Sequence, residues 1–165
     1  MMTAMKFSHR MSYDAAPADV LAMLSDPVFR EKVCAAIHSV RHDVSIDGSG
    51  NGMRVVVDQT QPAHGIPSFA RKFVGDEIRI VQRESWTSPK GADLKVEIPG
   101  KPGEVSGSIS LDAEGAAGTT ETVEGDVKVR IPMIGGKLEG LVRDMLVAAL
   151  KTEEGVGRAW LAGDR

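Results

Sequence analysis

The stretch GDVKVRIPMIGGKLEGLVRDML, residues 125–146, joins two patterns of different period. In its first part, the apolar residues Val127, Val129 and Ile131 alternate with charged residues, which predicts a strand with one buried face. Beyond one proline and two glycines, apolar residues recur at every third or fourth position from Leu138 onward, which predicts a long amphipathic helix. The C-terminal part of the chain is therefore expected to be a strand followed by a long helix.

Upstream of this stretch, alternating apolar and polar residues predict six more strands. Two short helices are predicted after the first strand, because prolines at positions 17 and 27 follow capping residues and precede apolar residues at helical spacing. The glycine-rich residues 48–52 predict the turn of a hairpin. The strands are expected near residues 5–13, 40–46, 53–59, 78–86, 94–98, 105–111 and 123–131.

This order of elements does not alternate strands with helices, so the predicted fold class is α+β with a largely antiparallel, seven-stranded sheet. The terminal helix is the one predicted element long enough to cover the sheet, and a strongly twisted sheet would curl around it. Four small residues are expected between these layers: Gly107, Gly125, Ala148 and Ala149. They either leave a hollow or let the helix pack tightly on the sheet.

Glycines also interrupt the predicted terminal helix, at Gly140, Gly155 and Gly157. Each costs about 1 kcal/mol relative to alanine in a helix interior. Either the helix frays after Glu154 or its backbone approaches the sheet closely there.

The chain has 165 residues, which fits a single domain, expected over residues 5–161 with short ends at 1–4 and 162–165. It carries 20 Lys and Arg against 23 Asp and Glu, a net charge of −3, and 4 Phe, 2 Trp and 1 Tyr. An acidic balance and so few aromatic residues argue against a nucleic-acid partner.

The single cysteine, Cys34, cannot close an intramolecular disulfide, and no set of Cys and His residues has the spacing of a zinc site. We therefore expect no metal and no cofactor. No apolar run approaches the roughly 20 residues that span a bilayer, and the opening MMTAMKFSHR lacks the apolar region of a signal peptide. A cytoplasmic protein without stable membrane insertion is expected, and its oligomeric state is left open.

The predicted order of one strand, two short helices, six strands and a long helix resembles the START-like helix-grip (SRPBCC) superfamily, which includes START lipid carriers, birch-pollen-type allergens and polyketide cyclases. Residues 125–146, with Glu153-Glu154 and Trp160-Leu161 further on, are similar to a bacterial family within it, domain-of-unknown-function family 2505. The match covers about residues 5–161, and IPMIGGKLEG is its most specific part. The resemblance implies a curved sheet wrapped around the C-terminal helix and a hydrophobic pocket beneath that helix. It implies no particular reaction and brings no catalytic residues.

The main functional hypothesis is therefore the binding of a small hydrophobic molecule, lipid-like or polyketide-like, between sheet and helix. Residues 61–75 place apolar side chains on one side of a short, partly helical element, which is either a lid over the pocket or a flap packed on the core. The residues expected to contact a ligand are Phe7, His9, Val55, Val57, Phe69, Phe73, Ile80, Gln82, Glu84, Val96, Ile109, Val127, Leu138, Val142 and Met145.

Five polar residues share the inward faces of the predicted strands: His9, His42, Gln59, Gln82 and Glu84. A buried polar group without a partner costs roughly 1–3 kcal/mol. These side chains therefore either orient the polar end of a ligand or lie where strand ends open to water. Among them, His9, Gln82 and Glu84 are the candidate orienting groups.

Glu84 and His9 are also the candidate catalytic residues of an alternative hypothesis, a cyclase or dehydratase. A carboxyl group among Ile80 and Trp86 is expected to have its pKa raised by desolvation, as a general acid or base requires. A lone carboxylate without a positioned nucleophile is weak support for an enzyme, so binding is the preferred reading. A third hypothesis is a protein-interaction module with a solid interior and no ligand.

Overall fold

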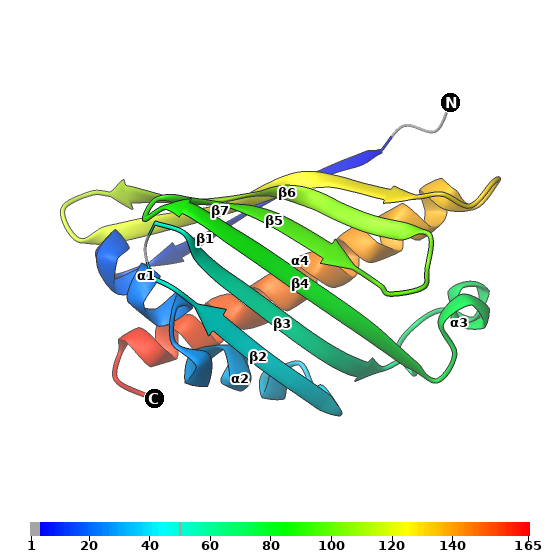
Figure 1. The fold of residues 1–165 in the computed structure, drawn as a ribbon, viewed down its shortest axis with the longest axis horizontal. Coiled ribbons are helices and arrows are strands. Elements are labelled where there is room, and N and C mark those ends of the chain that lie inside the picture. Colours follow the sequence, from blue (N-terminus) through cyan, green and yellow to red (C-terminus); the bar gives the residue numbers. More distant parts are fainter. Residues whose placement is uncertain (1–3, 50) are drawn as a thin grey trace.

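A long helix, α4 (Gly135–Leu161), lies along the concave face of one curved sheet in the computed structural model, which describes residues 4–49 and 51–165 (Figure 1). Residues 1–3, in the expected N-terminal extension, and Gly50, in the expected hairpin turn, lie outside the described residues. The strands are β1 (Met5–Tyr13), β2 (Arg41–Asp47), β3 (Met53–Pro62), β4 (Glu77–Ser88), β5 (Gly91–Glu97), β6 (Gly103–Glu114) and β7 (Gly118–Val129). The shorter helices are α1 (Pro17–Leu24), α2 (Pro27–Ala36) and α3 (Ser68–Val74).

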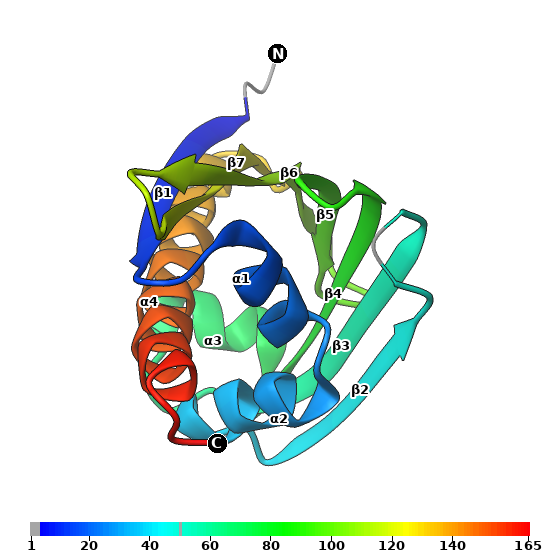
Figure 2. The ribbon, with the colours of Figure 1, turned by 90° about the vertical axis from the view of Figure 1, so that its left-hand side faces the viewer.

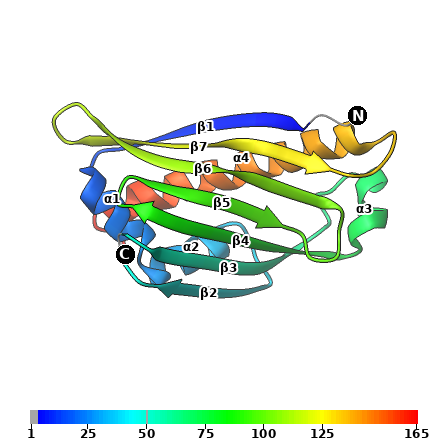
Figure 3. The same cartoon turned by 45° about the horizontal axis from the view of Figure 1, so that its top comes forward.

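All neighbouring strands pair antiparallel, in the order β1-β7-β6-β5-β4-β3-β2, which can be followed in Figure 3. The sheet curls around α4, and Figure 2 shows α1 and α2 at one end of the resulting trough. This arrangement confirms the predicted α+β helix-grip fold with two short helices after the first strand.

The two short helices begin where the sequence indicates. Pro17 and Pro27 occupy the first turns, where a missing backbone N–H costs nothing. The side chain of Asp26 accepts a hydrogen bond from the backbone N–H of Val28 at 2.9 Å and so caps α2. The N-cap residue of α1 is Ala16, which makes no side-chain capping hydrogen bond, so the predicted capping holds at α2 and not at α1.

Gly107 and Gly125 have a different role from the one predicted, because they face each other across β6 and β7. A Cβ on Gly125 would lie 2.6 Å from the Cα of Gly107, and a Cβ on Gly107 would lie 2.9 Å from the Cα of Gly125. No side chain fits at such distances. The two glycines therefore permit a close approach of adjacent strands; they neither leave a hollow nor seat the helix.

The helix α4 continues without fraying to Leu161, and Gly157 is where its backbone approaches the sheet. A Cβ at this position would lie 2.8 Å from Cε1 of Tyr13 and 3.2 Å from Cε of Met23. Gly155, two residues earlier and exposed, has nothing within 4 Å of such a Cβ. Of the two explanations for the helical glycines, close approach therefore holds at Gly157.

The two glycines give a matched stability prediction. Gly155→Ala should raise the free energy of unfolding by about 1 kcal/mol, because alanine favours the helix and meets no neighbour. Gly157→Ala should be less stable than Gly155→Ala by about 1–3 kcal/mol, because its methyl group overpacks against Tyr13. Urea unfolding of both variants measures the difference, and equal stabilities would contradict the close contact.

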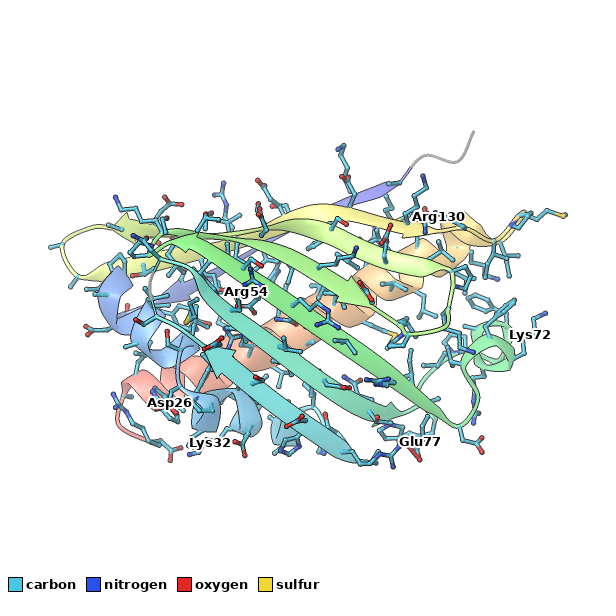
Figure 4. All side chains as sticks on the ribbon, in the orientation of Figure 1. Asp26, Lys32, Arg54, Lys72, Glu77 and Arg130 are labelled. Atoms are coloured by element: carbon cyan, nitrogen blue, oxygen red, sulfur yellow. The ribbon has the colours of Figure 1, made fainter. Side chains whose placement is uncertain are left out.

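The interior is divided into two parts along the length of α4. At the end covered by α1 and α2, buried side chains including Met11, Trp86 and Trp160 form the larger apolar cluster. At the α3 end, a smaller cluster contains Ile78 and Leu138. In Figure 4, Lys72 and Arg130 mark the α3 end, and Asp26 and Lys32 mark the opposite end. Among the helices that the structure describes, none is long and apolar enough to cross a membrane.

Candidate functional site

A cavity of about 150 Å³ lies at the α3 end, between the concave face of the sheet, α3 and the first half of α4. Its wall is mostly apolar, and its charged residues are Lys101 and Glu104. The volume is smaller than the few hundred cubic ångströms usual for small-molecule sites. It matches the size of an engineered cavity that binds benzene. The predicted hollow between sheet and helix is therefore present over one half of the interior, while the other half is filled.

Eight of the fifteen residues expected to contact a ligand lie on the wall of this cavity. They come from three strands and two helices, and the strand positions are the inward ones that alternation indicates. The eight are Phe73, Ile80, Gln82, Val96, Val127, Leu138, Val142 and Met145. Of the two alanines predicted between the layers, Ala149 lies on the wall and Ala148 is exposed.

The other seven expected residues lie elsewhere. Four of them, Phe7, Val55, Val57 and Ile109, belong to the packed cluster under α1 and α2. Phe69 lies outside the wall, with the Nζ atom of Lys137 4.1 Å from its ring centroid. His9 and Glu84 are also absent from the wall. Alternation identifies which face of a strand is buried, but not which part of the buried face remains unfilled.

The segment between β3 and β4 forms one side of the cavity. It contains α3, as the predicted partly helical excursion requires, and contributes Ile66, Ala70 and Phe73 to the wall. The contact of Lys137 with the Phe69 ring connects α3 to the start of α4. Movement of α3 as a lid stays a prediction.

The carboxylate of Glu84 accepts four hydrogen bonds from three side chains, at the boundary between the cavity and the packed cluster. Arg30 Nη1 donates to Glu84 Oε2 and Arg30 Nη2 to Glu84 Oε1, both at 2.8 Å. Trp86 Nε1 donates to Oε1 at 3.0 Å, and Gln82 Nε2 donates to Oε2 at 2.6 Å. Both side chains of the ion pair are almost completely buried, with 3% of Arg30 and 1% of Glu84 exposed.

The expectation that the pKa of Glu84 is raised is wrong. Burial alone would raise this pKa, but the charge of Arg30 and the hydrogen bonds from Arg30, Trp86 and Gln82 favour the carboxylate and hold the pKa below its usual value. Glu84 is therefore ionised and fully engaged, which is unsuitable for a general acid or base at neutral pH.

Three further buried carboxyl groups, Glu121, Glu139 and Glu153, are not among the candidate site residues of the sequence, and neither is Arg30. Burial raises the pKa of Glu153 to about 7, against the attraction of Arg30. Burial and the neighbouring charges of Glu153 and Glu84 raise the pKa of Glu121. The sequence pattern does indicate that both side chains face inward. Glu121 alternates in phase with the inward Val123, and Glu153 lies four residues, about one helical turn, after Ala149.

Of the remaining inward polar residues, His42 and Gln59 lie toward the ends of β2 and β3, whereas His9 lies in the middle of β1. Ser39 Oγ and Gln61 Nε2 donate to Gln59 Oε1 at 2.5 and 3.4 Å, and Gln59 and Gln61 both line the cavity. His42 is exposed, with its Nε2 atom 4.0 Å from Glu31 Oε2. Within the described residues, His9 Nε2 is buried without a hydrogen-bond partner.

The cavity can therefore accept an apolar molecule and offers it a few amide groups, Gln59, Gln61 and Gln82, on one wall. Within residues 4–49 and 51–165, no three His, Cys, Asp or Glu side chains are grouped as metal ligands. Cys34 is buried, and burial raises the pKa of its thiol to about 11, so the thiolate nucleophile is suppressed.

Known proteins resemble this chain in sequence and in fold. A family model described as "Protein of unknown function (DUF2505)" matches residues 8–161. An uncharacterized protein of Mycobacterium tuberculosis is 26% identical over 136 residues, which cover 79% of this chain and 77% of the relative.

Three solved structures have similar folds at low sequence identity. The Zhui aromatase/cyclase of a Streptomyces species has a TM-score of 0.69 and 14% identity, covering 99% of this chain and 100% of that one. Norcoclaurine synthase of Thalictrum flavum, in complex with dopamine and hydroxybenzaldehyde, has a TM-score of 0.62 and 13% identity, covering 99% and 90%. A START superfamily protein of Mycobacterium smegmatis has a TM-score of 0.60 and 14% identity, covering 93% and 96%.

Proposed function

We infer that this chain, which belongs to the DUF2505 family and has the helix-grip fold, binds a small hydrophobic molecule in the cavity beneath α3. The observation that carries the proposal is the contrast between the two halves of one interior. The half under α1 and α2 is closely packed, whereas the half under α3 keeps a largely apolar cavity of about 150 Å³. Protein interiors are normally packed without gaps larger than a water molecule, so an unfilled, partly open apolar cavity is suited to bind a ligand.

The size of the cavity favours a ligand, or a part of a ligand, with about the dimensions of one substituted benzene ring. Burial of its apolar surface would drive binding at about 25 cal/mol per Å², before the cost of association. The structural neighbours support the proposal, because they include an aromatase/cyclase and a synthase in complex with dopamine and hydroxybenzaldehyde. Whether the natural ligand is lipid-like or polyketide-like stays a prediction, as does the cytoplasmic location.

A matched pair of variants on α4 tests this proposal. Ethylbenzene, titrated against the protein and followed by NMR or calorimetry, should bind the native chain. Ala149→Leu should weaken this binding at least tenfold, because the new side chain fills the cavity. Ala148→Leu should leave it unchanged, since residue 148 is exposed on the same helix. Absence of binding to the native chain, or equal binding by both variants, would exclude the cavity as the site.

The acid–base alternative has less support. Glu84 and His9 do not line the cavity, and Glu84 is an engaged carboxylate. No second function is proposed.

A further inference from the structure

We propose that the cavity selects a ligand whose polar group is a neutral hydroxyl, as in an alcohol or a phenol, and that the side-chain oxygen of Gln82 accepts its hydrogen bond. This inference rests on the proposed function, because it concerns the occupant of the same cavity. It goes further by naming the polar group that the wall recognises and the class of compound that it rejects.

The first step is the state of Glu84. Its two oxygens accept two hydrogen bonds from the guanidinium group of Arg30 and one from the indole of Trp86, and all three donors are N–H groups. A carboxylate with such partners has no proton to give and acts only as an acceptor. Any further neighbour of Glu84 must therefore present a donor.

The second step is the orientation of the Gln82 amide. Gln82 Nε2 lies 2.6 Å from Glu84 Oε2, and the reverse orientation of the amide would place two acceptors against each other. The ion pair thus fixes the NH₂ group of Gln82 toward Glu84 and leaves its carbonyl oxygen pointing away. Gln82 is on the cavity wall, and its oxygen has no hydrogen-bond partner within the described residues. This oxygen is therefore available as an acceptor at the cavity surface.

The third step is the neighbouring strand. Gln59 pairs with Ile80, and Val57 pairs with Gln82, so the two glutamines are diagonal neighbours on the same face of β3 and β4. The oxygen of Gln59 already accepts from Ser39 and Gln61, which leaves its NH₂ group as a donor for the cavity. A hydroxyl group both donates and accepts, so it satisfies Gln82 and Gln59 together.

A carboxylate does not meet these requirements. It would bring lone pairs toward the Gln82 oxygen and a negative charge toward the ionised Glu84 behind it. Arg30, the cation that would attract it, is already bound by Glu84 and does not line the cavity. Lys101 does line the cavity, but it is exposed, so its charge is screened by solvent.

Four probes of similar shape test the inference: ethylbenzene, 4-ethylphenol, 4-ethylanisole and 4-ethylbenzoate. Dissociation constants are measured at neutral pH for the native chain and for Gln82→Met, in which the amide is replaced by an apolar side chain of similar length. In the native chain, 4-ethylphenol should bind about threefold to tenfold tighter than 4-ethylanisole, whose ether oxygen cannot donate, and 4-ethylbenzoate should bind weakest. In Gln82→Met the preference for the phenol over the anisole should disappear.

The outcomes separate this inference from the function on which it rests. Binding of ethylbenzene without a preference for the phenol over the anisole, or with equal affinity for the benzoate, overturns the inference and keeps the hydrophobic site. Failure of every probe to bind overturns both. If Gln82→Met does not fold, the ranking of the four probes on the native chain still decides.

Discussion

Replacing Arg30 with methionine should lower the free energy of unfolding by about 3–5 kcal/mol. The substitution keeps much of the apolar volume of the side chain but removes both hydrogen bonds to Glu84. Glu84 would then remain as a buried carboxylate with only Trp86 and Gln82 as partners, or would have to take up a proton. An uncompensated buried charge is among the most destabilising changes a single substitution can cause.

Urea unfolding at neutral pH measures this effect, and Arg79→Met is the matched control. Arg79 also makes two hydrogen bonds to a carboxylate, with Asp58 at 3.0 and 2.7 Å, but 56% of its side chain is exposed. The control should lose much less, because a solvent-exposed ion pair contributes little to stability. Removing both partners in Arg30→Met with Glu84→Leu should recover much of the loss, since neither charge of the pair is then left buried without the other. A loss in Arg30→Met no larger than in the control would contradict this account.

The same ion pair explains how the packed half of the interior and the cavity are connected. Glu84 lies on β4 between Trp86, which belongs to the packed cluster, and Gln82, which lines the cavity. Arg30 comes from α2, one of the helices that close the packed end. The orientation of an amide on the cavity wall therefore depends on a helix at the other end of the molecule.

The fold was accessible from the sequence because it follows from periodicity. Alternation locates the strands and their inward faces, and the three-to-four spacing after residue 135 locates the long helix. Proline and glycine positions set the turns. These signals are local, so one sequence is enough to read them.

The site was less accessible because it depends on contacts between distant residues. Arg30 and Glu84 are 54 positions apart, and alternation shows that Glu84 faces inward without showing which cation meets it. Arg30 follows the apolar Phe29 on a short helix, and a charged residue at such a position is expected to be exposed to solvent. The position of the cavity is also non-local, since it depends on where α1 and α2 stop filling the trough and α3 begins to cover it.

Glu153→Gln should raise the free energy of unfolding at pH 8 by about 1–3 kcal/mol. The usual glutamate pKa is 4.5, and burial raises the pKa of Glu153 in the folded chain to about 7. Between these two values the unfolded chain has released this proton while the folded chain still holds it, so stability falls as the pH rises from 4.5 to 7 and then levels off. The raised pKa corresponds to about 3 kcal/mol, an upper limit because the glutamine is itself a buried polar group.

The dependence of stability on pH tests this assignment, because the ionisable groups around Glu153 change the stability in different pH ranges. Glu84 on β4 has a lowered pKa, so its contribution is lost on the acid side as the pH falls below its usual value. Glu121 on β7 has a raised pKa like Glu153, and Arg30 on α2 opposes the increase at both carboxyl groups.

Glu153→Gln should therefore remove part of the decline in stability between pH 4.5 and 7 and keep the loss of stability at acid pH. Asp144→Asn, which alters an exposed carboxyl group on the same helix, should keep the decline. Urea unfolding from pH 4 to 8 measures both profiles, and an unchanged slope in Glu153→Gln would show that Glu153 is already ionised in the folded chain.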